Sequence, residues 1–259
     1  RMRVAEQGIK QRKFLGLTGN AWTLLMLGVG AILTTADFIL AFFYTPVVYG
    51  AGVGGSKMIG GVVVSQQLLF SQKIFYFHVP VAIGSFLVFT FAAAYAVLFL
   101  VRKDSNYDIR SRTGMEVTLL LVMLTLITGD IWTRFEWGVW WAFGEPRLTT
   151  YAIMALLVVA YFVLRAAVSD DERRATYGAV FCIIAWIDAP ISFVITRMIP
   201  TSIHPVVLRA GGGLTGSQLL AFLLGLFGMM FTSWAIYQLR LREEFAKVRI
   251  DALKEALEG

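Results

Sequence analysis

The sequence predicts an all-α integral membrane protein with six transmembrane helices. Of its 259 residues, 58% are hydrophobic and only 15% are charged, and the mean hydropathy is +0.70. These values lie outside the range of ordinary soluble domains. Two further observations support this fold class: the apolar residues are gathered into six long runs, and the basic residues are spread unevenly between them.

Each of the six apolar runs is long enough to cross about 30 Å of hydrocarbon as a helix. They lie at 22–44, 74–101, 117–133, 151–168, 177–198 and 219–237. The first run is too long for a cleaved signal peptide, so we expect it to be retained as a membrane anchor. The whole chain, 1–259, is predicted to form a single six-helix membrane domain.

The basic residues predict the orientation, because Lys and Arg are retained on the cytoplasmic side during insertion. If both termini are cytoplasmic, seventeen of the 23 Lys and Arg residues fall on the inner side. The outer segments then hold the other six, which are Lys57, Lys73, Arg134, Arg147, Arg197 and Arg209. Both termini are therefore predicted to be cytoplasmic, and the chain is expected to lie in the inner (cytoplasmic) membrane. Its net charge of +6 fits attraction to anionic headgroups rather than nucleic-acid binding.

Two segments outside the runs carry their own predictions. The outer loop 46–73 is rich in glycine and is either a flexible cap or a tolerated insertion. The segment 240–259 is predicted to continue the sixth helix into the cytoplasm, where it either docks onto a partner or ends as a solvated helix. Its apolar stripe consists of Leu241, Phe245, Val248 and Ala252.

The chain contains only two histidines, and both fall at outer boundaries of predicted spans. His78 lies in "IFYFHVPVA" and His204 lies in "PTSIHPVVLRAGGG". A single histidine at such a boundary is usually structural or merely exposed, but two at the same depth favour a ligand site. Imidazole is a common protein ligand of haem iron, and a pair on opposite faces of the macrocycle gives six-coordinate iron.

A tryptophan cluster lies on the same predicted side, in "EWGVWWAFGEPRLTT" at 136–150. Tryptophan offers a broad apolar surface and a polar N–H suited to a membrane interface. Trp137, Trp140 and Trp141 are therefore candidates to cover the edge of a haem. An ordinary aromatic belt is the alternative, but the clustering between Gly138 and Gly144 makes a belt less adequate.

The segment "WGVWWAFGEPRLTT" resembles the WWD domain of the haem-handling proteins of cytochrome c biogenesis, the CcmC/CcsA family. With "FHVP", a later loop histidine and six spans, the chain is similar to the CcmC branch over nearly its whole length. The resemblance implies that a WWD loop at 134–148, between the third and fourth helices, lies on the outer surface. It also implies that His78 and His204 are axial ligands of a non-covalent haem b.

The match to the WWD pattern is incomplete at its end. The family pattern is W-G-x-W-W-x-W-D-x-R, whereas Phe143 stands here for the third tryptophan. Glu145 and Arg147 keep the acidic-x-Arg ending only after one extra residue. The residues that match the haem platform are Trp137, Gly138, Trp140 and Trp141.

Arginines on the predicted outer side are candidates to hold the haem propionates, because charge-assisted bonds from arginine suit carboxylates at an interface. Arg147 is the first candidate and Arg134 the second, with Arg197 and Arg209 close to His204 in sequence. Lipid phosphate is the alternative partner of each. Arg134 is also predicted to pair with Asp130, four residues earlier on a helix.

The resemblance implies haem trafficking in cytochrome c maturation, with haem presented to an extracytoplasmic haem chaperone. The partners it implies are ABC-type membrane and ATPase subunits and a small single-span subunit. Cys182 is the only cysteine, and "GGGLTG" at 211–216 lacks the Lys-Ser/Thr ending of a P-loop. No residue is therefore a candidate for bond-making chemistry, and whether the chain counts as part of an enzyme stays open.

Two other functions remain as alternatives. An interaction subunit that keeps the fold without haem is favoured by the altered WWD ending. A membrane b-type cytochrome would also use histidines, but electron transfer across the bilayer generally needs two haems and four ligands. A solute transporter is disfavoured because the sequence shows no convincing internal repeat.

Overall fold

The computed structural model of the protein describes residues 19–46, 57–59, 62–64, 70–199, 202, 204 and 214–258. Six helices in these residues are long and apolar enough to cross a membrane, so the predicted six-helix membrane fold is confirmed. The helices are α2 (Gly19–Phe43), α3 (Phe75–Arg102), α4 (Ser105–Glu136), α5 (Pro146–Ala167), α6 (Asp171–Met198) and α7 (Gly216–Glu258).

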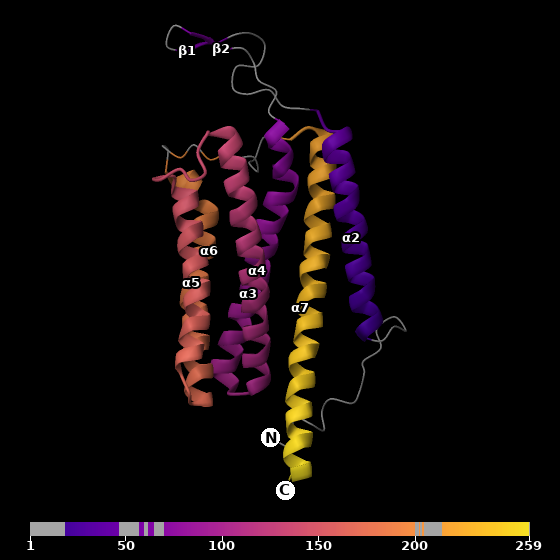
Figure 1. The fold of residues 1–259 in the computed structure, drawn as a ribbon, viewed down its shortest axis with the longest axis vertical. Helices are drawn as coiled ribbons and strands as arrows, with labels where there is room; N and C mark the ends of the chain where they lie inside the picture. Colours follow the sequence, from indigo (N-terminus) through magenta and orange to yellow (C-terminus); the bar gives the residue numbers. More distant parts are fainter. Residues whose placement is uncertain are drawn as a thin grey trace.

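The loop between α2 and α3 holds three short elements that the sequence does not predict. β1 (Lys57–Ile59) pairs antiparallel with β2 (Val62–Val64), and Figure 1 shows this hairpin beyond the end of the bundle. A short 3-10 helix, η1 (Phe70–Ile74), leads directly into α3. The rest of the glycine-rich loop, the basic N-terminal residues and Arg209 lie outside the described residues.

The six helices form three antiparallel pairs (Figure 1). α3 and α4 make the central pair, α5 and α6 pack on one side of it, and α2 packs with α7 on the other. We call the end at which α2 finishes and α3 begins the upper end, as drawn in Figure 1. Because the number of spans is even, the start of α2 and the end of α7 lie together at the lower end. The assignment of the lower end to the cytoplasm remains a prediction from the basic residues.

α4 begins at Ser105, well before the predicted start of the third span at 117. Asp104 caps the helix, since its carboxylate accepts a hydrogen bond from the backbone N–H of Asn106 at 2.9 Å. The charged residues of the first turns stay helical because partners on other helices neutralise them. Asp108, for example, accepts two hydrogen bonds from Arg165 of α5, at 2.7 and 2.9 Å.

Further ion pairs join α4 to α7 at the lower end of the bundle. Arg240 of α7 lies 2.6 Å from a carboxylate oxygen of Glu116 of α4, and 2.8 Å from one of Glu244 on its own helix. Arg112 of α4 also pairs with Glu244, which is almost fully buried. Because each charge has a partner on the facing helix, the two helices are held together where the apolar core ends.

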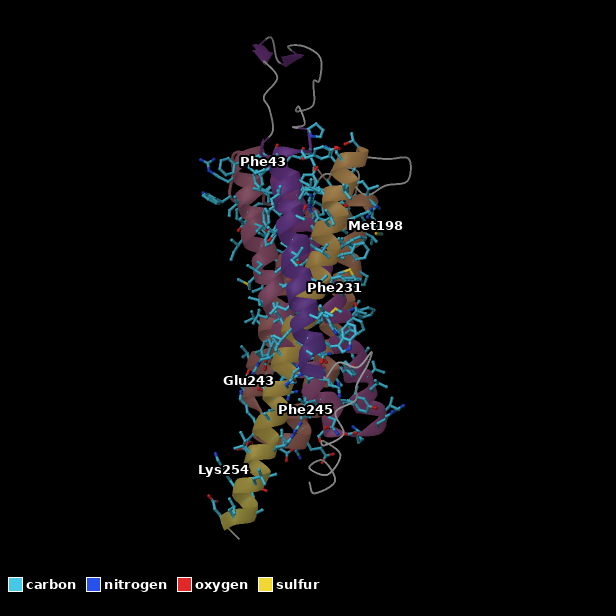
Figure 2. The ribbon with its side chains drawn as sticks, turned by 90° about the vertical axis from the view of Figure 1, so that its right-hand side faces the viewer. Phe43, Met198, Phe231, Glu243, Phe245 and Lys254 are labelled. Carbon is cyan, nitrogen blue, oxygen red and sulfur yellow. The ribbon has the colours of Figure 1, made fainter. Side chains whose placement is uncertain are left out.

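α7 continues as one helix from the upper end to Glu258, beyond the lower end of the other helices (Figure 1). Leu241 is buried and Phe245 packs against the core, whereas Val248 and Ala252 are exposed. Figure 2 shows Lys254 on the projecting part and Phe245 beside the bundle. The bundle therefore covers only the first half of the apolar stripe at 241–252.

α2 packs against α7 through glycines that allow a close approach of the two backbones, as is common between membrane helices. A Cβ atom at Gly30 would lie 2.4 Å from Thr232 Oγ1 and 2.9 Å from the backbone nitrogen of Thr232. A Cβ atom at Gly228 would meet Thr34 in the same way, 2.8 Å from its backbone nitrogen. Any side chain at these two positions would push the helices apart.

We therefore expect Gly30→Ala to destabilise the protein by about 1–3 kcal/mol, the usual cost of overpacking. Gly28→Ala is the matched control, because no atom lies within 4 Å of its Cβ position and alanine is the better helix former. Thermal unfolding of both variants in detergent measures the difference. Equal melting temperatures would show that the α2–α7 contact is not tight.

Candidate functional site

A cavity of about 280 Å³ lies at the upper end of the bundle and is lined by residues of α3, α4, α5 and α6. Both histidines of the chain line this cavity, His78 from α3 and His204 from the segment after α6. Trp141 and Arg147 also line it. The structure thus brings together four of the residues that the sequence analysis assigned to the site.

His78 lies in the second turn of α3, with its ring against α4. Its Nδ1 is 2.9 Å from Thr128 Oγ1. The next residue of α4, Gly129, leaves room for the ring, since a Cβ atom there would lie 3.1 Å from His78 Cε1. The imidazole is therefore held at the wall of the cavity by two successive residues of α4.

His204 is held by aromatic contacts instead. Its ring centroid is 5.9 Å from that of Trp132 and 6.4 Å from that of Trp137, and the two indoles meet edge to face at 5.0 Å. Trp132 also lines the cavity but was not predicted, because its position within an apolar run gives no sign of it. Its contact with Trp137 appears only once the end of α4 is folded.

The environment of His204 keeps its imidazole neutral at neutral pH. Burial, and secondly the positive charge of Arg147, lower the pKa of His204 from 6.5 to about 4. Its Nδ1 is buried and has no hydrogen-bond partner in the part of the chain that the structure describes. A neutral ring of this kind can offer a nitrogen lone pair to a ligand.

The loop between α4 and α5, 137–145, orients its aromatic residues differently. Gly138 and Gly144 adopt positive φ angles of 74° and 90°, which glycine tolerates and other residues rarely do. Trp141 faces the cavity, whereas Trp140 is 62% exposed and Phe143 is 92% exposed. Only Trp141 of the predicted tryptophans therefore lines the cavity. Trp137 packs against Trp132 and His204, and Trp140 and Phe143 form an exposed apolar surface beside the cavity.

Hydrogen bonds fold this loop back onto the end of α4. Thr133 donates to the backbone oxygen of Trp140 at 2.8 Å, and Arg134 donates to the backbone oxygen of Gly138. The expected ion pair between Arg134 and Asp130 does not form, because the guanidinium points to the loop. Arg134 does not line the cavity, so its contacts indicate a role in shaping the loop.

Glu145 joins the start of α5 to the segment that carries His204. Its side chain is only 4% exposed. It accepts hydrogen bonds from the backbone N–H of Arg147, at 3.4 Å, and from the hydroxyl of Ser202, at 2.6 Å. Pro146 occupies the first helical position of α5, where its missing N–H has no cost. Ser202 was not predicted from the sequence, because its contact spans two loops.

Arg147 places a guanidinium at the cavity wall. It donates hydrogen bonds to the backbone oxygen of Phe193 at 3.0 Å and to Thr196 Oγ1 at 3.2 Å. Its Nε is buried without a hydrogen-bond partner among the described residues. Arg197 lines the same cavity. Two arginine side chains and one unused buried N–H therefore favour an anionic group on the ligand.

The described residues contain no group of three or more His, Cys, Asp or Glu that could hold a metal ion by itself. The cavity instead combines two imidazoles, a flat indole wall and arginines. This combination of side chains suits a planar, largely apolar ligand that has acidic substituents and carries a metal ion with two free coordination positions.

The fold and the cavity together define a multi-pass membrane protein with a ligand site at one end of its helical bundle. The chain belongs to the CcmC family, Heme exporter protein C, whose sequence model matches residues 6–256. The similarity to the CcmC branch that was inferred from the WWD segment is thereby confirmed.

Individual relatives are similar over much of their length. The chain is 25% identical over 238 residues to the heme exporter protein C of Rhodobacter capsulatus, covering 84% of each chain. It is 24% identical over 184 residues to that of Paracoccus denitrificans, covering 70% of this chain and 76% of the relative. For the protein of the same name from Escherichia coli, identity is 26% over 121 residues, 47% of this chain and 49% of the relative.

The low pKa of His204 gives a test of the cavity in the free protein. We expect its ring to titrate near pH 4 in the NMR spectrum of histidine-labelled protein, with assignment from a His204→Ala variant. Between pH 6.5 and 4 the unfolded chain then binds more protons than the folded one, so the protein loses stability as the pH falls through this window. A midpoint near 6.5 would contradict the burial of His204.

Proposed function

We propose that this chain binds haem at the upper end of its bundle and presents it to another protein during cytochrome c maturation. Membership of the heme exporter protein C family supports haem handling in general. The observation that carries the specific proposal is that the only two histidines of the chain, far apart in sequence, line one cavity.

His78 and His204 are proposed as the axial ligands of a non-covalently bound haem b. One nitrogen of His78 contacts Thr128, which leaves the other for iron. His204 is neutral, and its Nδ1 has no hydrogen-bond partner among the described residues. Two imidazoles give low-spin, six-coordinate iron. Haem is here a cargo, so the chain needs only to bind, orient and release it.

The cavity is small for a whole porphyrin. Its volume of about 280 Å³ lies just below the roughly 300–1,000 Å³ of pockets that enclose a drug-sized ligand. Haem would therefore enter by one edge, against Trp141, and its other edge would remain accessible beside the exposed Trp140 and Phe143. Partial enclosure suits a protein that hands its ligand on.

Arg147 is the proposed partner of a haem propionate, assisted by Arg197. Both line the cavity, and Arg147 has a buried N–H without a partner in the described part of the chain. Arg134 is engaged with the loop backbone, which makes it the weaker of the two arginines named first from the sequence.

The proposal includes an orientation of the chain in the membrane and a set of partner proteins. The upper end, with the WWD loop, would face the extracytoplasmic side and a haem chaperone there, while the lower end and the α7 extension would lie in the cytoplasm. ABC-type membrane and ATPase subunits and a small single-span subunit would supply the ATP-driven step. The name heme exporter protein C of the relatives supports such an assembly.

The first test is the visible absorption spectrum of the purified protein with added hemin, alongside His78→Ala and His204→Ala. We expect a low-spin Soret spectrum in the parent, and a high-spin spectrum or at least about tenfold weaker binding in each variant. If the parent takes up no haem, or both variants keep the parent spectrum, the ligand assignment is wrong. The interaction-subunit alternative would then become the leading function.

The release of haem distinguishes a haem-handling protein from a membrane b-type cytochrome that transfers electrons. A haem-handling protein loses its haem on mixing with an apo-form of its chaperone, whereas a b-type cytochrome retains it. Two histidines suffice for one haem only, which favours handling.

The role of Arg147 can be tested with two forms of the ligand. Arg147→Gln should weaken hemin binding by about 10- to 100-fold, the equivalent of one charged hydrogen bond of about 1.5–3 kcal/mol. Arg134→Gln should change it by less than about threefold. The dimethyl ester of haem has no propionate charge, so its binding should be insensitive to Arg147→Gln. Equal losses with both ligands would show that Arg147 acts on the fold instead.

A further inference from the structure

We propose that Thr128 fixes the tautomer and orientation of His78, so that Nε2 is the nitrogen offered to iron. The inference rests on the proposed function, since it concerns His78 as a haem ligand. Thr128 does not line the cavity, so it would act through His78 as a positioning residue.

The Thr128 hydroxyl has a single proton to donate. Oγ1 lies 2.8 Å from the backbone oxygen of Leu124 and 3.2 Å from that of Thr125. Threonine in a helix commonly donates its proton to such a carbonyl in the preceding turn. Carbonyl oxygens only accept, so the hydroxyl proton is used there and the oxygen keeps its lone pairs for another donor.

The contact with Thr128 indicates which ring nitrogen of His78 carries the hydrogen. Nδ1 is 2.9 Å from the Thr128 oxygen, which accepts at this contact when its own proton lies on the Leu124 carbonyl. We therefore place the hydrogen of His78 on Nδ1. A neutral imidazole has one N–H, so Nε2 is left with a free lone pair. Metal-bound histidines in general donate their other N–H to an acceptor, which fixes the ring and strengthens the ligand.

The imidazole ring of His78 is also held in one orientation. Cε1, the carbon between the two nitrogens, lies against Gly129, where a Cβ atom would be only 3.1 Å away. The neighbouring residues Thr128 and Gly129 thus bound one edge of the imidazole, one by a hydrogen bond and the other by the absence of a side chain. A ring flip would give up the hydrogen bond and present a carbon to Thr128.

His204 is held differently. Its Nδ1 is buried without a hydrogen-bond partner among the described residues, and its ring is held by Trp132 and Trp137. Within the described part of the chain, the hydrogen bond that fixes a tautomer is therefore found at His78 alone.

The experiment compares three threonine variants in the full-length protein loaded with hemin. Thr128→Val removes the hydroxyl but keeps the shape, and Thr128→Ser keeps the hydroxyl. Thr118→Val is the matched control, because Thr118 is buried on the same helix and donates to the oxygen of Gly114 at 2.8 Å, as Thr128 does to Leu124. Thr118 does not line the cavity.

We expect Thr128→Val to weaken hemin binding by about 10- to 100-fold, as is usual when a metal ligand loses its hydrogen-bond acceptor. Its haem reduction potential should rise, because imidazole without that acceptor donates less charge to ferric iron. Thr128→Ser should stay within about threefold of the parent, and Thr118→Val should leave the potential unchanged. If Thr128→Val matches the control, or Thr128→Ser fails as Thr128→Val does, the hydroxyl has no positioning role.

A measurement without haem keeps this inference separate from the proposed function. The nitrogen NMR spectrum of histidine-labelled, ligand-free protein distinguishes the two tautomers directly. We expect the Nδ1–H form for His78 in the parent and a loss of that preference in Thr128→Val. An Nε2–H form in the parent would overturn the inference even if haem binds, whereas the Nδ1–H form in a protein that takes up no haem would overturn only the proposed function.

Discussion

The absence of water from the hydrocarbon core is the constraint on which the whole structure depends. Every backbone polar group there must be satisfied within the protein, and the threonine hydroxyls of α4 follow the same rule. In α4, four threonines donate to carbonyl oxygens one turn earlier, namely Thr113, Thr118, Thr125 and Thr128. Charged and ligand-binding groups are consequently displaced to the two ends of the bundle, where helices stop and loops begin.

The two ends use their polar groups in opposite ways. At the lower end, pairs such as Arg165 with Asp108 and Arg240 with Glu116 neutralise each other between helices. At the upper end, Arg147 Nε and His204 Nδ1 are buried without hydrogen-bond partners among the described residues. A buried polar atom without a partner costs about 1–3 kcal/mol, and a ligand in the cavity would supply the partners of these two; Arg112 Nε at the lower end is also buried without one among the described residues. The lower end is built for stability, and the upper end carries the features of a binding site.

The sequence predicts most of the fold because a helix that crosses a membrane must be apolar along most of its length, and hydropathy measures this property. It also predicts His78, His204, Trp141 and Arg147, since these residue types are rare in apolar segments. What it misses depends on packing between elements. Thr128, Trp132 and Ser202 are ordinary residue types, and their roles arise only from contacts with residues far away in the sequence. The start of α4 is placed too late because its charged residues lower the local hydropathy and suggest a loop, whereas in the fold they pair with residues of other helices. Trp140 and Trp141 look equivalent in sequence, but the positive φ angles of Gly138 and Gly144 shape the loop that turns one outward and the other to the cavity.

The close packing of α3 against α4 has a consequence for the site. Gly114 meets Ala92 so tightly that a Cβ atom would lie 2.8 Å from the Cβ of Ala92. Thr128 follows Gly114 by fourteen residues and His78 precedes Ala92 by fourteen, so both contacts belong to one antiparallel register. That register is set by the two-residue turn at the lower end, where Lys103 adopts a positive φ of 54°. One residue inserted into the first turn of α4 would shift the residues after it by about 1.5 Å along the helix and by about 100° around it, if the start of the helix stayed in place. The alignment of an imidazole at one end of the bundle is thus dictated by the length of a turn at the other.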